Sequence, residues 1–249
     1  MDEYEQMTRN RFGELADRAR QSGIYTYTGF HSLRTAGLAY DIAPEREVSL
    51  WGGARECERV VVRFGDPQEL GYEEDFPIRI LCVKPKQEKF ADDLSHRDFL
   101  GAVLNLGIER DVIGDILVDR NSAYVLCLEG MADFICENLE RVRHTSVTCS
   151  LAEQVPPDAL PKLCEEHVTV SSPRLDAVLA KVYHLSRGEA KDLFEEEKVL
   201  VNGRICRSPE TMLKEACGIT VRGLGRLEYR GEERATKKGK TGITVWRYV

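Results

Sequence analysis

The spacing of apolar residues in the C-terminal third of the chain predicts two short helices. The first has apolar side chains at i, i+3, i+4 and i+7, the pattern of one helical face: Leu175, Val178, Leu179 and Val182. A second helix is expected after a break at residues 183–185, because Ser186 and Glu189 have the spacing of a capping box. Its inward positions are Ala190, Leu193 and Phe194.

Strand patterns follow these helices. Residues 199–201 are apolar and β-branched, and Asn202-Gly203 supplies the two positive-φ positions of a tight hairpin turn. Residues 219–222 and 226–230 then alternate between apolar and polar side chains, as strands do. The C-terminal third is therefore expected to be a small α/β module.

Two cations of this module share one helical face. Arg187 and Lys191 are four residues apart, near the helix N-terminus, where free amides and the helix dipole also favour an anion. Such a face suits a phosphate group. The alternative is an ordinary solvated face on which Lys191 pairs with Glu195, a contribution of about 0.3–0.5 kcal/mol.

The order of these motifs resembles a known RNA-binding fold. An Arg-Leu-Asp start, a Leu-Ser-Arg-x-x-Ala helix, a short strand, a Val-Asn-Gly-Arg turn and a closing hairpin are similar to the domain of small-subunit ribosomal protein four, called the S-four domain here. The resemblance covers about a quarter of the chain and implies that structured RNA, rRNA or tRNA, binds across the two-helix face. The implied contacts are Arg174, Ser186, Arg187, Lys191, Arg204 and Arg207, to which we add Lys181, Asn202 and Arg222 of the same module.

Residues 1–73 are predicted to form an N-terminal α/β unit. A first amphipathic helix, ended by Gly23, has the inward positions Phe12, Leu15 and Ala19. A second helix is expected at residues 32–42, before Pro44. Two strands on either side of a Gly52-Gly53 turn are expected at residues 48–51 and 60–64.

Residues 74–150 show a β-α-β-β-α-β order. The expected strands are residues 78–83, 116–119, 123–128 and a weaker one at 146–150, and the expected helices are residues 98–106 and 131–142. That order predicts a ferredoxin-like (RRM-like) domain, and the fold class as a whole is α+β. Because Tyr124 is the single aromatic residue of the third strand, we expect a scaffold or protein-contact domain rather than a reader of unpaired bases.

The remaining segments are expected to be connections. Residues 151–170, with three prolines, are predicted to be a linker, so that residues 171–249 form the S-four-like RNA-binding domain (αL motif). Before the linker, Arg141, Arg143 and His144 are either a second basic contact or cations near a helix C-terminus. Near the chain end, a basic loop offers further backbone contacts: Lys237, Lys238 and Lys240.

Charge is divided unevenly along the chain. The net charge is −7, yet residues 171–249 contain 16 Lys and Arg against 11 Asp and Glu, a net charge of +5, whereas residues 1–170 contain 19 against 31, a net charge of −12. A basic module on an acidic body fits RNA docking through that module. The eight cysteines form no C-x-x-C pair, so no metal site is expected and reduced, cytoplasmic thiols are favoured. With no signal peptide and no apolar span of about 18 residues, no membrane association is expected.

Known catalytic motifs are missing. His96-Arg97-Asp98 has the letters of the protein-kinase catalytic loop, but no Asn follows at the required spacing, and Ser95 is better understood as the cap of a helix. Gly-x-Ser-x-Gly, His-Glu-x-x-His and dinucleotide-binding patterns are absent as well. We expect no enzymatic activity and no cofactor.

A wider resemblance includes the central domain. Residues 95–108 and 113–116 are similar to the central part of the YlmH family, whose members carry an S-four domain at the C-terminus. The resemblance implies a non-catalytic protein that binds the large ribosomal subunit with a peptidyl-tRNA and acts in rescue of stalled translation. Two alternatives stay open: a protein-interaction factor in cell division or photosystem assembly, and an rRNA- or tRNA-modifying enzyme with an unrecognised site.

Overall fold

The structure is a computed structural model that describes residues 3–235 and 240–248 of the 249-residue chain, without the side chains of residues 233–235. It divides into two compact units, Met1–Leu160 and Pro161–Val249. Within the described ranges, no helix is both long and apolar enough to cross a membrane. The two units are described separately below.

The N-terminal part of the first unit packs helices against a three-stranded sheet of order β1-β3-β2. Phe12 of the first helix contacts Phe64 of the last strand edge to face, and both are fully buried. The expected helix that ends at Gly23 is therefore confirmed. The elements are α1 (Glu3–Ser22), β1 (Thr26–Ser32), α2 (Leu33–Ala36), η1 (Gly37–Asp41), η2 (Glu45–Glu47), β2 (Val48–Trp51), β3 (Arg59–Phe64) and α3 (Pro67–Leu70).

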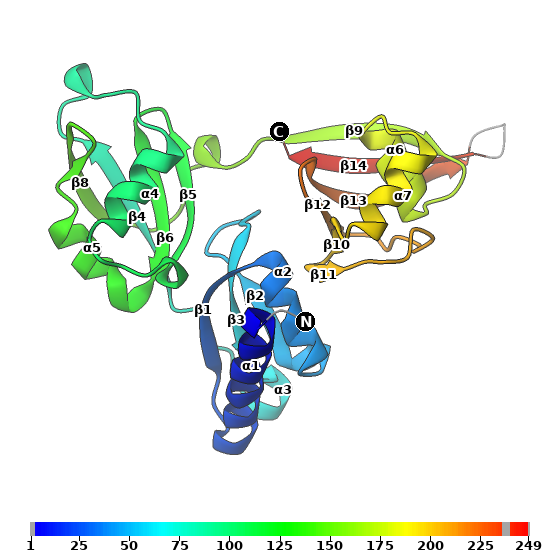
Figure 1. The fold of residues 1–249 in the computed structure, drawn as a ribbon, viewed down its shortest axis with the longest axis horizontal. Coiled ribbons are helices and arrows are strands. Elements are labelled where there is room, and N and C mark those ends of the chain that lie inside the picture. The colour runs from blue at the N-terminus through cyan, green and yellow to red at the C-terminus, as the bar shows by residue number, and fades with distance from the viewer. Residues whose placement is uncertain (1–2, 236–239, 249) are drawn as a thin grey trace. The chain divides into compact units, whose positions relative to one another are not determined.

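The central part has a five-stranded antiparallel sheet of order β5-β6-β4-β8-β7. Two helices cover one face (Figure 1), where Phe99, Val103 and Ile135 pack on Leu81 and Val125. The elements are β4 (Ile78–Pro85), η3 (Glu88–Phe90), α4 (His96–Leu104), η4 (Arg110–Val112), β5 (Ile113–Asp119), β6 (Ser122–Leu128), η5 (Glu129–Met131), α5 (Ala132–Asn138), β7 (Arg141–Val142), β8 (Thr145–Ala152) and η6 (Pro157–Ala159).

The other face of the central sheet is covered by the N-terminal part and by the segment after β8. One buried cluster joins Phe30 and Val61 of the N-terminal part to three side chains of the sheet, Cys82, Tyr124 and Leu126, and to Val155 and Ala159 of the segment after β8. The approach is so close that a Cβ at Gly53 would lie 2.7 Å from Ile78 Cγ2, a distance that only glycine avoids. Tyr124 is therefore buried and unavailable for stacking on a base.

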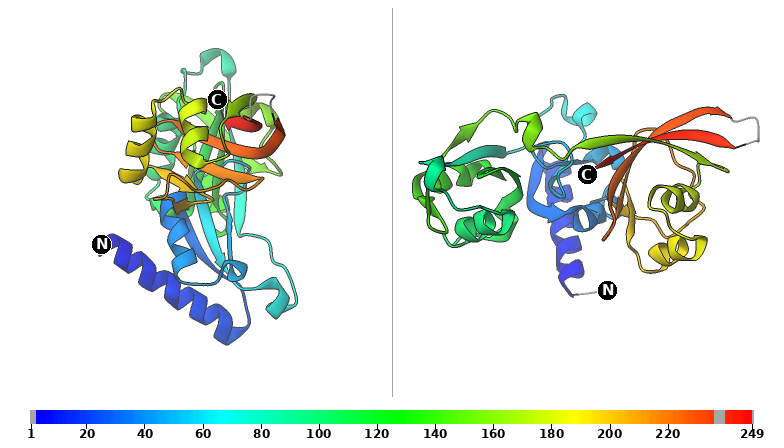
Figure 2. Two further views of the ribbon diagram at one scale, coloured as in Figure 1. Left: turned by 90° about the vertical axis from the view of Figure 1, so that its right-hand side faces the viewer. Right: turned by 90° about the horizontal axis from the view of Figure 1, so that it is seen from above.

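The second unit has a six-stranded antiparallel sheet of order β11-β10-β12-β13-β14-β9 with two helices on it. β13 and β14 form a long hairpin (Figure 2). The core joins both helices to the sheet through Leu175, Leu179, Phe194, Ile219 and Leu227. The elements are β9 (Leu163–Val170), α6 (Leu175–Val182), α7 (Arg187–Glu195), β10 (Val199–Val201), β11 (Arg204–Ile205), β12 (Cys217–Val221), β13 (Gly225–Ala235) and β14 (Thr241–Tyr248).

Three sequence-based expectations need correction. Residues 163–170 are not linker: they form β9, which pairs with β14 along its whole length. The helix expected at residues 131–142 ends at Asn138, and Arg141 lies in strand β7. The second N-terminal helix is a short α2 followed by η1, and strand β1 was not expected at all.

Candidate nucleic-acid interface

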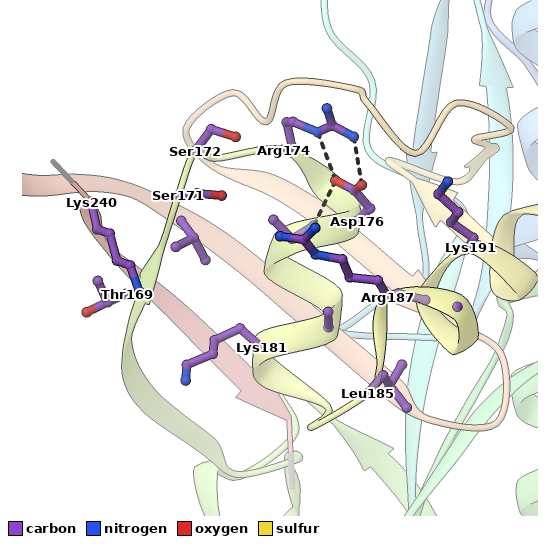
Figure 3. A pocket seen from close by; sticks show the side chains of 15 residues that line it. Thr169, Ser171, Ser172, Arg174, Asp176, Lys181, Leu185, Arg187, Lys191 and Lys240 are labelled. Carbon is purple, nitrogen blue, oxygen red and sulfur yellow. Dashed lines mark hydrogen bonds and ion pairs between the residues drawn. The ribbon is translucent and has the colours of Figure 1, made fainter.

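A basic groove of about 800 Å³ runs between α6, α7 and the end of β9 (Figure 3). Its five cations come from three parts of the second unit: Arg174, Lys181, Arg187, Lys191 and Lys240. Asp176 is the single carboxylate among the described residues that line it. The groove therefore has a strongly positive lining, as an RNA backbone site requires.

The packing of the two helices determines which side chains reach the groove. α6 buries four apolar side chains on its inner face, and α7 buries Ala190, Leu193 and Phe194. Lys181, Arg187 and Lys191 lie on the opposite faces and are exposed. The Arg187 side chain extends from α7 toward α6 (Figure 3). The helical periodicity in the sequence thus places these cations correctly.

Three of the groove cations are available to a ligand. Within residues 3–235 and 240–248, Lys181, Arg187 and Lys191 form no ion pair with a carboxylate. The alternative in which Lys191 pairs with Glu195 is therefore not what the structure shows. An anion that enters the groove would meet charges that are not already neutralised.

Arg174 is held differently, because it is paired within the groove wall. Its Nε and Nη2 lie 3.1 and 2.8 Å from the two carboxylate oxygens of Asp176, and Nη1 lies 3.3 Å from Glu210. Partial burial alone would raise the pKa of Asp176, but hydrogen bonds from Arg174 and from the Ala177 amide outweigh it and lower the pKa. Asp176 therefore stays charged and fixes the Arg174 guanidinium.

The start of α7 has the capping box that the sequence predicted. The Glu189 amide donates to Ser186 Oγ over 3.2 Å, and the Ser186 amide donates to Glu189 Oε2 over 2.7 Å. Hydrogen bonds from the Ser186 amide and hydroxyl lower the pKa of Glu189, because they favour its charged form. Ser186 thus sets the register in which Arg187 and Lys191 face the groove.

Five of the nine predicted contacts do not line the groove: Ser186, Asn202, Arg204, Arg207 and Arg222. Asn202 Oδ1 accepts from the Gly218 amide over 2.8 Å and supports the hairpin turn. Both Nε and Nη2 of Arg207 donate to Glu197, over 3.0 and 2.8 Å. Arg204 and Arg222 are exposed. The structure therefore brings together the helical half of the predicted set and leaves the hairpin half apart.

The sequence did not predict the groove wall formed by Thr169, Ser171 and Ser172. Thr169 lies at the end of β9, which was taken for linker, and Ser171 and Ser172 follow that strand; no local motif marks them. Of the three lysines expected in the basic loop, Lys240 lines the groove, whereas Lys237 and Lys238 lie outside the described residues.

The kinase-like motif lies at the start of a helix, and possible metal ligands are not clustered in the described residues. The Asp98 carboxylate accepts from the Ser95 amide over 2.8 Å and from its hydroxyl over 2.6 Å, so the kinase-like letters begin α4 as expected. Within the described parts of the chain, no cluster of three His, Cys, Asp or Glu side chains could hold a metal ion.

Comparison with known families supports this architecture. One family model, described as "Putative RNA-binding domain in YlmH", matches residues 71–154, and the model of the S4 domain matches residues 173–216. The chain therefore contains a region that matches the RNA-binding domain model of YlmH, followed by a region that matches the S4 domain. Neither matched domain model describes a catalytic family. The S4 match includes α6, α7 and the hairpin turn, so four of the five groove cations lie within it, and Lys240 lies outside it.

Two similar proteins have descriptive names. "Ribosome-associated protein quality control protein P2" of Bacillus subtilis (strain 168) is 29% identical over 178 residues, which cover 70% of this chain and 68% of that protein. A solved structure, "Cell division protein ylmH from Streptococcus pneumoniae", is 21% identical, with a TM-score of 0.48, over 61% of this chain and 93% of its own. 

Proposed function

We propose that this protein is a non-catalytic RNA-binding factor that docks through the S4 groove on structured RNA of the large ribosomal subunit. Its process would be ribosome-associated quality control, with stalled peptidyl-tRNA complexes as the target. The observation that carries the proposal is the set of unneutralised cations Lys181, Arg187 and Lys191 on two helices that a capping box and a shared core hold rigid.

The groove suits a folded RNA more than an unpaired strand. Its ligating groups are cations and hydroxyls, which contact phosphates and 2′-hydroxyl groups without reading bases. No aromatic side chain is among the described residues that line it, so stacking on unpaired bases is not provided for. The name of the Bacillus subtilis relative supports the assignment to ribosome-associated quality control.

We also propose that the central part is a ferredoxin-like domain that supports the S4 domain rather than reading bases. The spatial order β8-β4-β6-β5 supports this topology, because it is the 4-1-3-2 order of the four main strands. The covered sheet face supports the second half of the proposal.

The first test measures how RNA binding depends on salt. Full-length protein and the double variant Arg187→Ala/Lys191→Ala are titrated by filter binding against purified 23S rRNA over a KCl series. Each lost phosphate contact should reduce the slope of log K against log [KCl] by about one unit, so the double variant should lose about two. Lys214→Ala is the matched control, because Lys214 is an exposed cation of the same unit outside the groove.

If the double variant keeps the slope of the parent protein, the groove does not bind the RNA. Co-sedimentation then tests the ribosomal assignment. The protein should travel with purified large subunits at low salt and leave them at high salt, and the double variant should leave at a lower salt concentration than the control. A protein-interaction factor would not travel with the subunits at all.

A further inference from the structure

The central domain has a second basic groove on its helical side. It encloses about 550 Å³ between α4 and the chain that connects α5 to β8. Three arginines from these two segments line it: Arg97, Arg141 and Arg143. Two side-chain amides and two carboxylates complete the polar lining: Asn105, Asn138, Asp98 and Glu140.

The two carboxylates in the lining neutralise little of the charge of the three arginines. Arg97 and Arg141 are exposed and form no ion pair within the described parts of the chain. Arg143 Nε is 3.7 Å from Asp98 Oδ1, a long contact, and about half of its side chain is exposed. The Asp98 carboxylate accepts hydrogen bonds from the Ser95 amide and hydroxyl, so it caps α4 in addition to its long contact with Arg143.

The strand assignment changes how Arg141 and Arg143 are understood. They do not belong to the last turn of a helix, because α5 ends at Asn138 and the chain then forms the β7-β8 hairpin. Val142 pairs with Thr145, so Arg143 and His144 form a two-residue turn. Arg141 and Arg143 are therefore presented by a strand and a turn and not by a helix.

The backbone of Arg143 holds its side chain at the groove. Its φ is 52°, in the left-handed region that glycine adopts without strain and arginine does not. The turn places the Arg143 side chain in the groove lining, so a glycine at this position would relieve the strain and remove the cation together.

We propose that this arginine groove is a second RNA-backbone site, through which the central domain contacts RNA with its helical side and not with its sheet. The inference rests on the proposed RNA-binding function. Guanidinium groups bind phosphates bidentately, and the two asparagine amides suit 2′-hydroxyl groups. RRM-like domains commonly bind RNA with the open face of their sheet. That face is not available here, because the N-terminal part of the same unit covers it.

Two glycine substitutions test the proposal in the full-length protein. Arg143→Gly removes a groove cation and relieves the strained φ, so the variant should fold at least as stably as the parent. Arg120→Gly is the matched control: Arg120 has a φ of 53° in the two-residue β5-β6 turn, is exposed, and does not line the groove. With purified 23S rRNA and a KCl series, Arg143→Gly should lower the salt slope by about one unit and Arg120→Gly should not.

A second variant distinguishes the loss of a cation from a local rearrangement of the turn. Arg97→Gln/Arg141→Gln leaves the turn intact and should lower the slope by about two units. The proposal is overturned if both groove variants keep the parent slope while thermal unfolding shows them folded, an outcome that would favour a protein partner for this face. If Arg187→Ala/Lys191→Ala lowers the slope and the groove variants do not, the second site alone fails. If no variant lowers it, the RNA-binding function itself fails.

Discussion

At the scale of single residues, the Ser186 hydroxyl has the clearest consequence, because it begins the helix that carries Arg187 and Lys191. Ser186→Ala removes the acceptor for the Glu189 amide and should lower the free energy of unfolding of the second unit by about 1 kcal/mol. Chemical denaturation monitored by circular dichroism measures this. Ser186→Asp is the control, since aspartate also caps helices and should keep most of the stability.

The same cap predicts a pH dependence with a defined sign. The folded pKa of Glu189 is below its ordinary value of 4.5, because the Ser186 amide and hydroxyl favour the carboxylate. The stabilisation from this group is therefore complete above pH 4.5 and is lost as the pH falls through the folded pKa. In NMR titration, Ser186→Ala should move the Glu189 midpoint back toward the ordinary value. A midpoint that is unchanged would mean that the Ser186 hydroxyl does not contact the Glu189 carboxylate in solution.

At the scale of elements, the side chain of Asn202 stabilises the Asn202-Gly203 hairpin turn. Asn202 has a φ of 48°, and its Oδ1 accepts from the Gly218 amide. Asn202→Ala should cost about 1–3 kcal/mol, because it adds backbone strain and leaves that amide without its partner. Asn202→Gly separates the two effects: it relieves the strain and loses only the hydrogen bond, so it should cost less. Equal losses of Tm in the two variants would contradict this division.

The elements that the sequence predicted are those with local signals. The capping box, the Asn-Gly turn and the helical spacing of α6 each act within a few residues, and all three are present. Strand β1 gives no alternating apolar pattern, because two of its buried positions are threonines. Their hydroxyls donate to the Leu15 carbonyl and accept from the Val62 amide. Such partners are distant in sequence, and local periodicity does not reveal them.

The same reasoning explains why one wall of the candidate site was not predicted. β9 is an exposed edge strand with few apolar positions, and it exists because it pairs with β14 more than 70 residues later. The groove wall at Thr169 depends on that pairing. The opposite error occurred at residues 139–142, where Leu139 and Val142 continue a helical apolar spacing although Leu139 already has a ψ of 87°. Arg141 and Arg143 were consequently placed at a helix end.

At the scale of the whole molecule, charge and contact boundaries nearly coincide. The second unit begins at Pro161, ten residues before the boundary that the sequence suggested, and it contains every residue of the S4 groove. The basic and acidic parts of the chain thus have separate cores. Two cation-lined grooves, one in each unit, would bind a single RNA more tightly than either alone if their spacing matches it.

The boundary itself can be tested with two fragments. Residues 161–249 keep β9, which pairs with β14 through eight residues and contributes Val170 to the core. This fragment should unfold cooperatively and bind 23S rRNA with a smaller salt slope than the full chain, because it lacks the arginine groove of the central domain.

Residues 171–249 begin at the boundary that the sequence suggested and leave β14 as an unpaired edge. They should lose cooperative unfolding and aggregate, because an exposed hydrophobic edge strand pairs with other chains. Thermal unfolding followed by circular dichroism, with light scattering for aggregation, separates the two fragments. Equal Tm values would mean that β9 adds nothing to the S4 unit and that the chain from 163 to 170 acts as a linker after all.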